Sequence, residues 1–310
     1  MAGSVPLVSI GLPVYNGERY LEAAVDSLLA QTFTDFELII SDNASTDRTE
    51  AIGRAYAARD PRVRYFRNEH NIGAGPNYNR VFALAAGRYF KWAAHDDVCA
   101  PDFLARCVAA LDADPAVVLA YPRTTHIDEQ GQVTGTYAVA FATDSDRPAV
   151  RFHDLILINH WCFQIFGVIR ADVLRRTPLI GSFAASDRTL LARLGLLGRF
   201  HEVPEHLFLR RRHPEQLTAL PSRRLHARWY DPRQRRQITF PQWRILGEYL
   251  KAVRAVPLAG AERLACGRHL LAWIRRYRGK LGDDLVWAAR QALALPARGR
   301  RHEDGLPKSV

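Results

Sequence analysis

Between residues 7 and 212, short β-rich runs alternate with helical patterns, and this regular alternation constrains the fold more than any other feature. We predict strands at residues 7–12, 36–41, 63–67, 89–93, 117–121, 163–169 and 208–211. Helical patterns fill the early gaps, at residues 19–30, 48–58 and 76–86. Strands and helices in alternation build βαβ units, so we expect an α/β domain with a mainly parallel sheet and helices on both faces.

The pattern changes after Pro221, where helical runs follow at residues 242–253, 260–278 and 285–293. We therefore predict two parts, an α/β domain at residues 1–220 and a helical extension at residues 221–310. Within the first part, the Gly-, Thr- and Asp-rich segment 128–148 predicts a hairpin or a mobile loop.

Basic charge is concentrated in the C-terminal third. Residues 210–310 hold 23 Lys and Arg against 8 Asp and Glu, a net charge of +15, whereas the preceding 209 residues carry −4. Aromatic and basic residues interleave there, at Trp229, Trp243, Tyr249, Trp273, Arg275, Arg276, Tyr277, Arg278 and Trp287. Such helices fit an anionic membrane, glycan or lipid carrier, and they equally fit amphipathic helices that pack Trp inward and leave Arg in water. No recognised nucleic-acid-binding module accompanies the charge, so we predict no nucleic-acid partner.

Neither a spanning helix nor a secretory signal is predicted. No apolar run approaches the roughly 18 residues that a spanning helix needs, and the N-terminus has no basic segment before its first strand. Cys99, Cys107, Cys162 and Cys266 lack metal-ligand spacing and are typical of buried thiols in a reducing compartment. We expect a cytoplasmic protein, with its basic segment directed to the inner face of the membrane.

Polar residues follow the first two predicted strands. Pro13, Tyr15, Asn16 and Glu18 come after the first strand, at the carboxyl edge where open parallel sheets bind ligands. After the second, Asp42 is expected to protrude at the same edge and to accept hydrogen bonds from a base or ribose. The alternative is structural: the first motif is then a simple strand-to-helix turn, and the residues after Asp42 cap the next helix.

Two adjacent carboxylates, Asp96 and Asp97, follow the fourth predicted strand. Such a pair needs a cation or several hydrogen-bond donors to hold it together, and its oxygen ligands suit Mg²⁺ or Mn²⁺ carrying a diphosphate. Alternatively, Asp97 caps the helix after Pro101 and Asp96 faces solvent. The chain has no Gly-rich phosphate-binding loop, so a metal and helix N-termini are left to bind phosphates.

In order and spacing, these motifs resemble the family 2 glycosyltransferases, which have the GT-A fold. The resemblance extends over most of residues 6–215. Further matching positions are Asn43, Ser45, Asp47, Asn71, Gly73, Asn79, Gly87, Tyr89 and Pro101.

The resemblance implies an inverting enzyme that moves a sugar from a nucleotide diphosphate donor to a hydroxyl of a glycan or lipid-linked glycan. It places Tyr15 on the base, Asp42 in a hydrogen bond with that base, and a ribose and a Mn²⁺ or Mg²⁺ ion on Asp96 and Asp97. His213, in the run Arg210-Arg211-Arg212-His213, would complete the metal shell or contact phosphate, unless it lies in a solvated basic surface. The implied nucleotide-sugar site comprises Pro13, Tyr15, Asn16, Glu18, Asp42, Asn43, Asn79 and Asp96.

Asp187 is the predicted general base. Ser186-Asp187 resembles the Glu-Asp pair of the family, with Ser186 in place of the Glu. An acceptor hydroxyl needs a carboxylate near the anomeric carbon to take its proton. Without the resemblance, Asp187 reads as an acidic residue favoured at a helix N-terminus. Two more positions depart from the family. Ala94 stands at the first position of the family's Asp-x-Asp-Asp motif, and Tyr78 stands where many relatives carry Arg.

Two other functions compete with glycosyl transfer. Nucleotidyl transfer also uses paired carboxylates and a metal, but it normally brings a Gly-rich loop with Lys or Arg at the first strand, and this chain has neither. A catalytically inert nucleotide-sugar-binding or anion-binding protein is the other alternative, because three family positions are altered.

Overall fold

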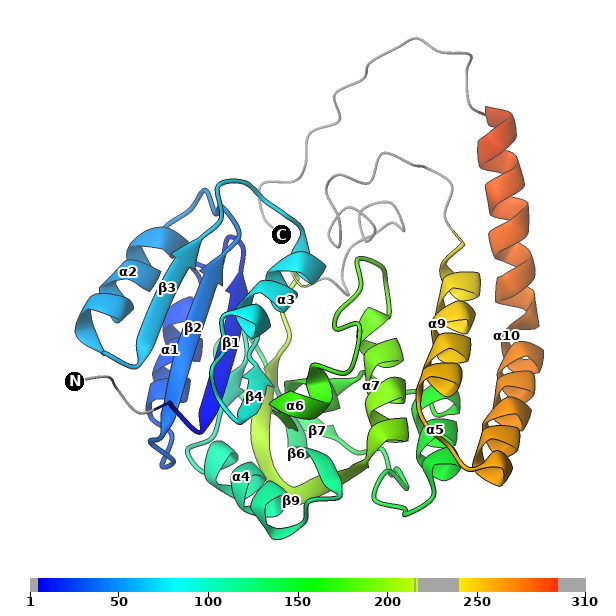
Figure 1. Cartoon of the computed structure of the whole chain (residues 1–310). Coiled ribbons are helices and arrows are strands. Elements are labelled where there is room, and N and C mark those ends of the chain that lie inside the picture. Colours follow the sequence, from blue (N-terminus) through cyan, green and yellow to red (C-terminus); the bar gives the residue numbers. More distant parts are fainter. Residues whose placement is uncertain (1–4, 215, 217–239, 295–310) are drawn as a thin grey trace.

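The computed structural model describes residues 5–214, 216 and 240–294 (Figure 1). The strands of the described residues are β1 (Val8–Val14), β2 (Phe36–Asp42), β3 (Val63–Arg67), β4 (Tyr89–Trp92), β5 (Val98–Cys99), β6 (Val117–Ile127), β7 (Val133–Tyr137), β8 (Val168–Arg170) and β9 (Arg199–Arg211). They form one sheet in the order β3-β2-β1-β4-β8-β6-β9-β5, and β7 pairs with β6 beside this path.

The sheet is mixed. Its first four strands pair in parallel, as the alternation predicted, but four of the eight strand pairings in the described part of the chain are antiparallel, among them β5 with β9 and β7 with β6. β1 pairs in parallel with β2 and β4, β2 with β3, and β6 with β9. β8 runs antiparallel to both of its neighbours, β4 and β6. The carboxyl ends of β1, β2, β3 and β4 therefore meet at one edge, where the sequence places its polar motifs.

Helices cover both faces of this sheet. They are α1 (Leu21–Leu29), α2 (Thr49–Arg59), α3 (Ala74–Ala83), α4 (Phe103–Ala113), α5 (Pro148–Leu157), the 3₁₀ helix η1 (Phe163–Phe166), α6 (Ala171–Leu174), α7 (Ser186–Leu197), α9 (Pro241–Ala255) and α10 (Gly260–Ala294).

The two faces of the sheet bury separate hydrophobic cores. Because side chains alternate along a strand, Leu38 and Ile40 of β2 pack in one core with residues of α1, α2 and α4. Ile39, between them, joins the other core, which contains residues of α3, α5, α7, α9 and α10. Both faces of β2 are thus covered, which explains its three consecutive apolar residues, Leu38, Ile39 and Ile40.

Three elements differ from the predicted ones. Residues 163–169 were expected to form one strand, but the first four form η1, and the strand begins only at Val168. Cys162, just before η1, has a φ of 60°, which directs the chain away from an extended path. β6 and β9 are both longer than predicted because they pair with each other along most of their length. Segment 128–148 does contain a hairpin, in which β7 pairs with β6.

The helical extension packs against the α/β part. α9 contacts α7, and α10 contacts α5 and α9, so these helices stand side by side at the right of Figure 1. The runs 260–278 and 285–293, predicted as two helices, lie within the single helix α10. Tyr249 and Trp273 are buried in the shared core, 0% and 2% exposed. The predicted boundary at residue 220 lies outside the described residues.

No helix in the described part of the chain is both long and apolar enough to cross a membrane. All four cysteines are free and buried.

Candidate active site

Asp96 and Asp97 lie in the loop after β4, beside the end of β9. The Oδ2 atom of Asp96 is 2.9 Å from Nε2 of His213. Asp97 Oδ1 accepts a 2.8 Å hydrogen bond from the backbone amide of Arg211. His213 and Asp97 are buried, at 7% and 8% exposure. The structure therefore brings together the three residues that the resemblance implied as metal ligands.

The Arg211 side chain holds the loop of Asp96 and Asp97 in place. Its guanidinium donates hydrogen bonds to the backbone carbonyls of Asp96 (2.9 Å), Asp128 (3.0 Å) and Glu129 (3.1 Å). It also lies 4.8 Å from the centre of the Tyr20 ring. The sequence singled out the arginine run but not this residue. Strand alternation is the signal that could have found it, since it puts Arg211 on the same side as His213.

The two carboxylates have opposite electrostatic environments. Burial raises the pKa of Asp96, but the hydrogen bond from His213 and the charges of His95 and His213 outweigh it and lower the pKa to about 2. Burial, and then the charge of Asp96, raise the pKa of Asp97 well above its usual range. One ionised and one proton-retaining carboxyl is the expected state of a close pair without a cation.

A divalent cation fits this donor set. Asp96, Asp97 and His213 offer carboxylate oxygens and an imidazole, and the buried Nδ1 atom of His213 has no hydrogen-bond partner in the part of the chain that the structure describes. Among the described residues, no three His, Cys, Asp or Glu side chains form a ready metal cage. Mg²⁺ is usually held by one or two carboxylates together with substrate phosphates, and such a site needs no cage.

Asp187 opens helix α7 and is partly buried. Its Oδ1 accepts a 2.7 Å hydrogen bond from the backbone amide of Arg188. Burial raises the pKa of Asp187, although Arg188 and the neighbouring Cys162 thiol act in the opposite direction. Ala185, with a φ of 65°, turns the chain into the helix, and the buried hydroxyl of Ser186 has no partner.

The phenol of Tyr78 is affected both by the Asp96–Asp97 pair and by Asp187. Burial raises its pKa, and the charges of Asp96, Asp97 and Asp187 each raise it further. Tyr78 is therefore near enough to all three carboxylates for their charges to affect its pKa. The backbone of Tyr78 is held in place, because its carbonyl accepts a 2.9 Å hydrogen bond from the Trp92 indole.

The loops after β1 and β2 are bonded to each other. The amide of Asn16 donates to Ser45 Oγ (2.9 Å), and the amide of Thr46 donates back to Asn16 Oδ1 (2.9 Å). The amide of Glu18 donates to Asp47 Oδ2 (3.0 Å). Asn16 and Glu18, which the sequence assigned to the nucleotide, thus also hold the two loops in register. Their contact with a nucleotide stays a prediction.

Tyr15 and Gly17 border the same edge. Tyr15 is partly exposed just beyond β1, while Pro13 is buried within that strand. A Cβ on Gly17 would lie 2.5 Å from Val14 Cγ2 and 2.9 Å from the His95 ring. Glycine therefore lets the first motif approach the loop that carries Asp96.

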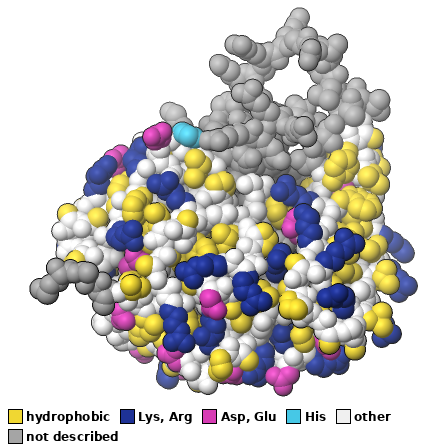
Figure 2. Space-filling view, in the orientation of Figure 1, with side chains coloured by type: hydrophobic (Ala, Val, Ile, Leu, Met, Phe, Trp, Pro, Cys, Tyr) yellow, Lys and Arg dark blue, Asp and Glu magenta, His cyan; other side chains and the backbone are white. Residues whose placement is uncertain are grey.

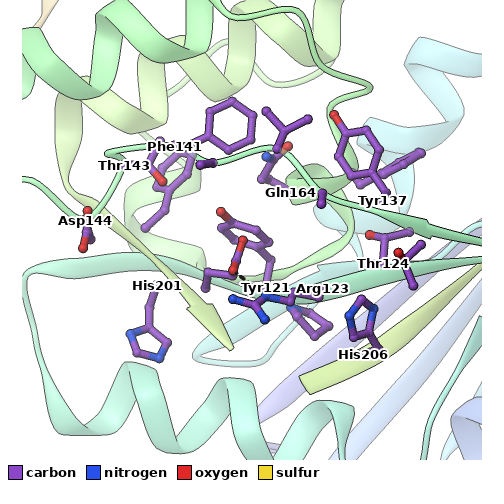
Figure 3. A pocket seen from close by; sticks show the side chains of 18 residues that line it. Tyr121, Arg123, Thr124, Tyr137, Phe141, Thr143, Asp144, Gln164, His201 and His206 are labelled. Carbon is purple, nitrogen blue, oxygen red and sulfur yellow. Dashed lines mark hydrogen bonds and ion pairs between the residues drawn. The ribbon is translucent and has the colours of Figure 1, made fainter. Parts of the chain in front are cut away.

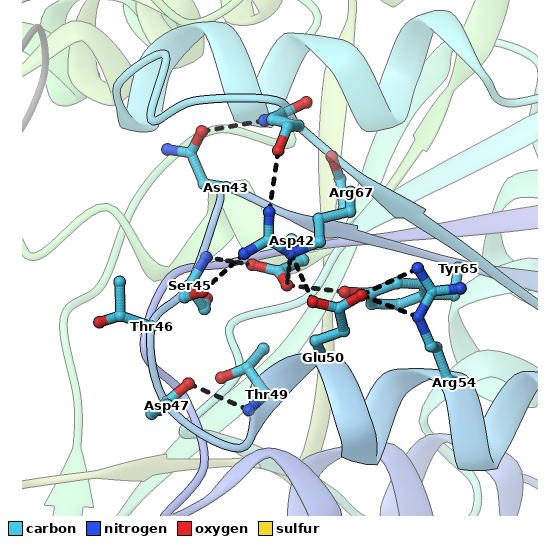
Figure 4. Close-up of polar contacts among 12 residues, drawn as sticks. Asp42, Asn43, Ser45, Thr46, Asp47, Thr49, Glu50, Arg54, Tyr65 and Arg67 are labelled. Carbon is cyan, nitrogen blue, oxygen red and sulfur yellow. Dashed lines mark hydrogen bonds and ion pairs between the residues drawn. The ribbon is translucent and has the colours of Figure 1, made fainter.

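Asp42 does not protrude as expected but is 0% exposed (Figure 4). Its Oδ1 accepts a 2.8 Å hydrogen bond from the Ser45 amide, and its Oδ2 accepts a 2.6 Å bond from the Tyr65 hydroxyl. Arg67 lies 3.6 Å from the same carboxylate. Tyr65 and Arg67 were not predicted from the sequence as site residues. Their place is predictable from strand register, because β3 pairs in parallel with β2 and ends at the same edge.

Asn43 and Asn79 are both engaged in bonds within the protein. Asn43 donates to Asn71 Oδ1 (2.9 Å) and accepts from Asn68 Nδ2 (2.9 Å). The Asn79 amide donates to the carbonyl of Ile180 (2.9 Å) and accepts from its backbone amide (3.0 Å). Asn79 therefore anchors the segment that leads to Asp187. The nucleotide role predicted for both asparagines is not tested by these contacts.

Curated relatives match part of the chain. A chondroitin synthase of Escherichia coli is 36% identical over 129 residues, which are 42% of this chain and 19% of that protein. An uncharacterized glycosyltransferase of Rickettsia typhi is 42% identical over 97 residues, 31% of this chain and 29% of that protein. The chain thus spans less than a third of the length of these two relatives.

Two solved structures share the fold. Staphylococcus aureus TarS 1-349, in complex with UDP-GlcNAc, superposes with a TM-score of 0.57 at 16% identity over 94% of this chain and 93% of that one. The mannosyltransferase PcManGT from Pyrobaculum calidifontis, in complex with GDP-Man and Mn²⁺, has a TM-score of 0.54 at 18% identity over 94% and 76%. These likenesses confirm the expected GT-A fold with its helical extension.

The family model named Glycosyl transferase family 2 matches residues 9–174, more than half of the chain. This range begins in β1, includes the Asp96–Asp97 loop and ends in α6. The chain therefore belongs to glycosyl transferase family 2.

Proposed function

We propose that this chain is an inverting glycosyltransferase that moves a sugar from a nucleotide diphosphate donor to a hydroxyl of a glycan or lipid-linked glycan. The observation that carries the proposal is the gathering of Asp96, Asp97 and His213 after β4 and β9, in a chain of this family. Such a cluster can hold the diphosphate of a donor, and Asp187 at the start of α7 would meet the reacting hydroxyl.

The donor would lie at the carboxyl edge of β1, β2 and β4. Tyr15 would pack on the base, and the Asp42 loop would border it. Asp96 would contact the ribose. The complexes of TarS with UDP-GlcNAc and of PcManGT with GDP-Man support a nucleotide diphosphate sugar as the donor. The similarity to a chondroitin synthase supports a glycan acceptor.

Asp96, with Asp97 and His213, would hold Mn²⁺ or Mg²⁺. When bound there, the ion would neutralise negative charge on the leaving diphosphate. The structure of PcManGT with Mn²⁺ supports a divalent ion of this kind. The protein supplies the ion's position, because Arg211 and its three carbonyl contacts fix the loop that carries Asp96.

Asp187 would act as the general base. The acceptor hydroxyl would give its proton to the Asp187 carboxylate as its oxygen attacks the anomeric carbon from the side opposite the diphosphate. A single displacement inverts the configuration at that carbon. The raised pKa of Asp187 makes this carboxylate a stronger base than an exposed aspartate.

A thermal-shift screen with UDP-, GDP- and dTDP-sugars, each with and without Mn²⁺ or Mg²⁺, tests the proposal. A ligand at 100 times its dissociation constant stabilises the native state by about 2.7 kcal/mol, so a true donor raises the melting temperature clearly. We expect one nucleotide to do so, and to do so more strongly with metal. The proposal fails if no nucleotide sugar stabilises the protein under any metal condition.

The exposed face of α10 would direct the enzyme to an anionic membrane surface. Leu264 and Leu271 are 60% and 57% exposed there, and Arg268, Arg275 and Arg278 are exposed on the same side of the helix. Hydrophobic and basic side chains also intermix along the right flank in Figure 2, where α10 lies. Apolar residues among arginines are typical of helices that lie in a membrane interface.

A further inference from the structure

A cavity of about 760 Å³ lies apart from the residues discussed so far (Figure 3). It is bounded by β6, β9, η1 and the segment 136–144 that continues β7. Its volume is within the range of about 300–1,000 Å³ that small-molecule sites occupy. None of Asp42, Asp96, Asp187 and His213 lines it, so it is separate from the proposed donor site.

Aromatic side chains form much of the cavity wall. Tyr121, Tyr137, Phe141, Phe163 and Phe200 all line it. Tyr137 and Phe163 pack edge to face with ring centres 4.9 Å apart, and the Tyr137 hydroxyl accepts a 3.0 Å hydrogen bond from the backbone amide of residue 161. These aromatic groups are therefore held in place before any ligand binds.

Polar groups reach the same cavity from buried positions. Gln164 is 2% exposed, yet its Oε1 atom has no hydrogen-bond partner among the described residues. Thr143, 3% exposed, and Glu202 line the cavity with it, and all three side chains are close enough to the Tyr121 phenol to affect its pKa, which burial raises. A buried polar atom without a partner is rare in folded proteins, and a ligand hydroxyl donating to Gln164 would satisfy this one.

The charges in the cavity favour an uncharged ligand. Arg123 is paired with Glu202 at 2.9 Å, and the remaining carboxylate of the lining is Asp144. No arginine or lysine of the lining is left to bind a phosphate. Aromatic rings beside fixed hydroxyl, amide and ion-pair groups instead match a sugar, which offers apolar C–H faces and many hydroxyls.

The cavity wall continues to the proposed reaction centre. Phe163 lines the cavity, and the residue before it, Cys162, is in contact with Asp187 through its thiol. On the other side, the Arg210 guanidinium lies 5.9 Å from the Phe163 ring centre, and its pKa is affected by the charges of Asp97 and Asp96. Phe163 thus borders the cavity, and Cys162 and Arg210 beside it are near enough to the acidic residues for electrostatic interaction.

We propose that this cavity binds neutral sugar residues of the acceptor glycan, next to the residue whose hydroxyl reacts at Asp187. The inference rests on the proposed function and adds the acceptor class: an uncharged oligosaccharide of at least two residues. The donor site would select the sugar that is transferred, and the cavity would select the chain that receives it.

Saturation-transfer NMR on the full chain, without donor or metal, tests the proposal directly. The probes are neutral trisaccharides of glucose, galactose, mannose and N-acetylglucosamine, together with one uronic-acid trisaccharide. We expect at least one neutral trisaccharide to bind. Gln164→Leu and Arg123→Ala should each weaken that binding at least tenfold. Arg123 is half exposed, so its variant tests the site even where the buried substitution impairs folding.

Gln132→Leu is the matched control, because Gln132 is exposed outside the cavity, in the turn before β7, and should leave trisaccharide binding unchanged. UDP- and GDP-sugar binding should be unchanged in all three variants. The inference is wrong if no neutral trisaccharide binds, if the uronic-acid probe binds more tightly, or if both cavity variants bind as the parent does. If one of these results is found while UDP- or GDP-sugars still bind, the cavity proposal is wrong but the proposed transferase function is not contradicted. If the trisaccharides bind but no nucleotide sugar does, the proposed transferase function is wrong and the cavity still binds sugar.

Discussion

The Asp187 carboxylate is proposed to act as the general base, yet its burial in the ionised form costs stability. The carboxylate is partly buried, and one of its oxygens is fixed by the Arg188 amide. Asp187→Asn should lower turnover by about a hundredfold to ten-thousandfold, the usual contribution of a positioned general base, with donor affinity nearly unchanged. Steady-state kinetics and calorimetric titration of the donor measure both quantities. A loss confined to donor affinity would place Asp187 at the nucleotide instead.

The same substitution should change stability in a pH-dependent way. Burial raises the pKa of Asp187 in the folded state, so its stabilising contribution is full below the unfolded pKa of about 3.9 and is lost as pH rises through the folded pKa. Asp187→Asn should therefore melt at a higher temperature than the parent at pH 7 to 8, and the difference should shrink towards pH 4. Thermal unfolding across this pH range measures it. An equal gap at all pH values would contradict the linkage.

Substitution of Asp96 or Asp97 should change metal and donor binding without unfolding the protein. Asn keeps a side-chain oxygen as acceptor for the Arg211 amide, so Asp97→Asn removes the group that would ionise on metal binding without leaving that buried donor unpaired. Asp96→Asn and Asp97→Asn should each lose most metal-dependent donor binding and turnover while remaining folded. The thermal-shift screen with and without Mn²⁺ provides the measurement. Metal-stimulated transfer in both variants would remove the metal assignment.

At the residue level, the sequence predicted which positions gather at the sheet edge better than what each side chain contacts. Asp42 lies at the predicted edge of the sheet, but its carboxylate is engaged by internal partners such as Tyr65, and the Asn79 amide is likewise engaged by Ile180. Such partners come from other strands and loops, so spacing within one motif carries no information about them.

At the level of elements, β9 holds the site together. Arg211→Ala would remove three hydrogen bonds to backbone carbonyls, of which only that of Asp128 keeps another donor, the Gly131 amide, and it should cost at least about 2 kcal/mol of unfolding free energy. Arg212→Ala is the control, because Arg212 is the exposed neighbour on the opposite side of the strand. Urea unfolding should show a lower midpoint for the first variant and an unchanged one for the second. Equal midpoints would mean that water replaces the guanidinium.

The strands and helices with regular patterns were predicted well, and those set by tertiary pairing were not. β3 has the predicted bounds, because its run of β-branched and aromatic residues coincides with its pairing to β2. The first part of β9, residues 199–207, was missed, since its polar residues alternate irregularly around a shift in register with β6. Gly279 and Gly282 suggested a break in α10, but packing against α5 and α9 keeps it continuous.

For the whole molecule, the basic extension should bind anionic vesicles through the outer face of α10. Each Lys or Arg near such a surface contributes about 1 kcal/mol, so a few arginines suffice for reversible binding. We expect co-sedimentation with anionic but not neutral vesicles, weakening as salt rises. Arg268→Glu/Arg275→Glu/Arg278→Glu should abolish it without disturbing the fold, since all three side chains are exposed.

Arg54→Glu/Arg59→Glu/Arg88→Glu, also at exposed positions but on the α/β part, is the matched charge control and should bind as the parent does. Equal sedimentation with neutral vesicles, or none at low salt, would leave α10 as a solvated face. Truncation is a poorer test, because α9 and α10 bury residues in the core that they share with α5 and α7.

Helix α10 also supplies carboxylates to the first turns of two other helices. Glu262 accepts a 2.8 Å hydrogen bond from the Ala149 amide at the start of α5, and Asp284 accepts a 2.7 Å bond from the Gln242 amide at the start of α9. During synthesis, α5 leaves the ribosome more than 100 residues before α10. Until α10 is synthesised, the α/β part therefore lacks the Glu262 cap of α5, and the apolar side chains that α9 and α10 later cover stay exposed. A chaperone that binds these side chains during translation would raise the yield of active protein.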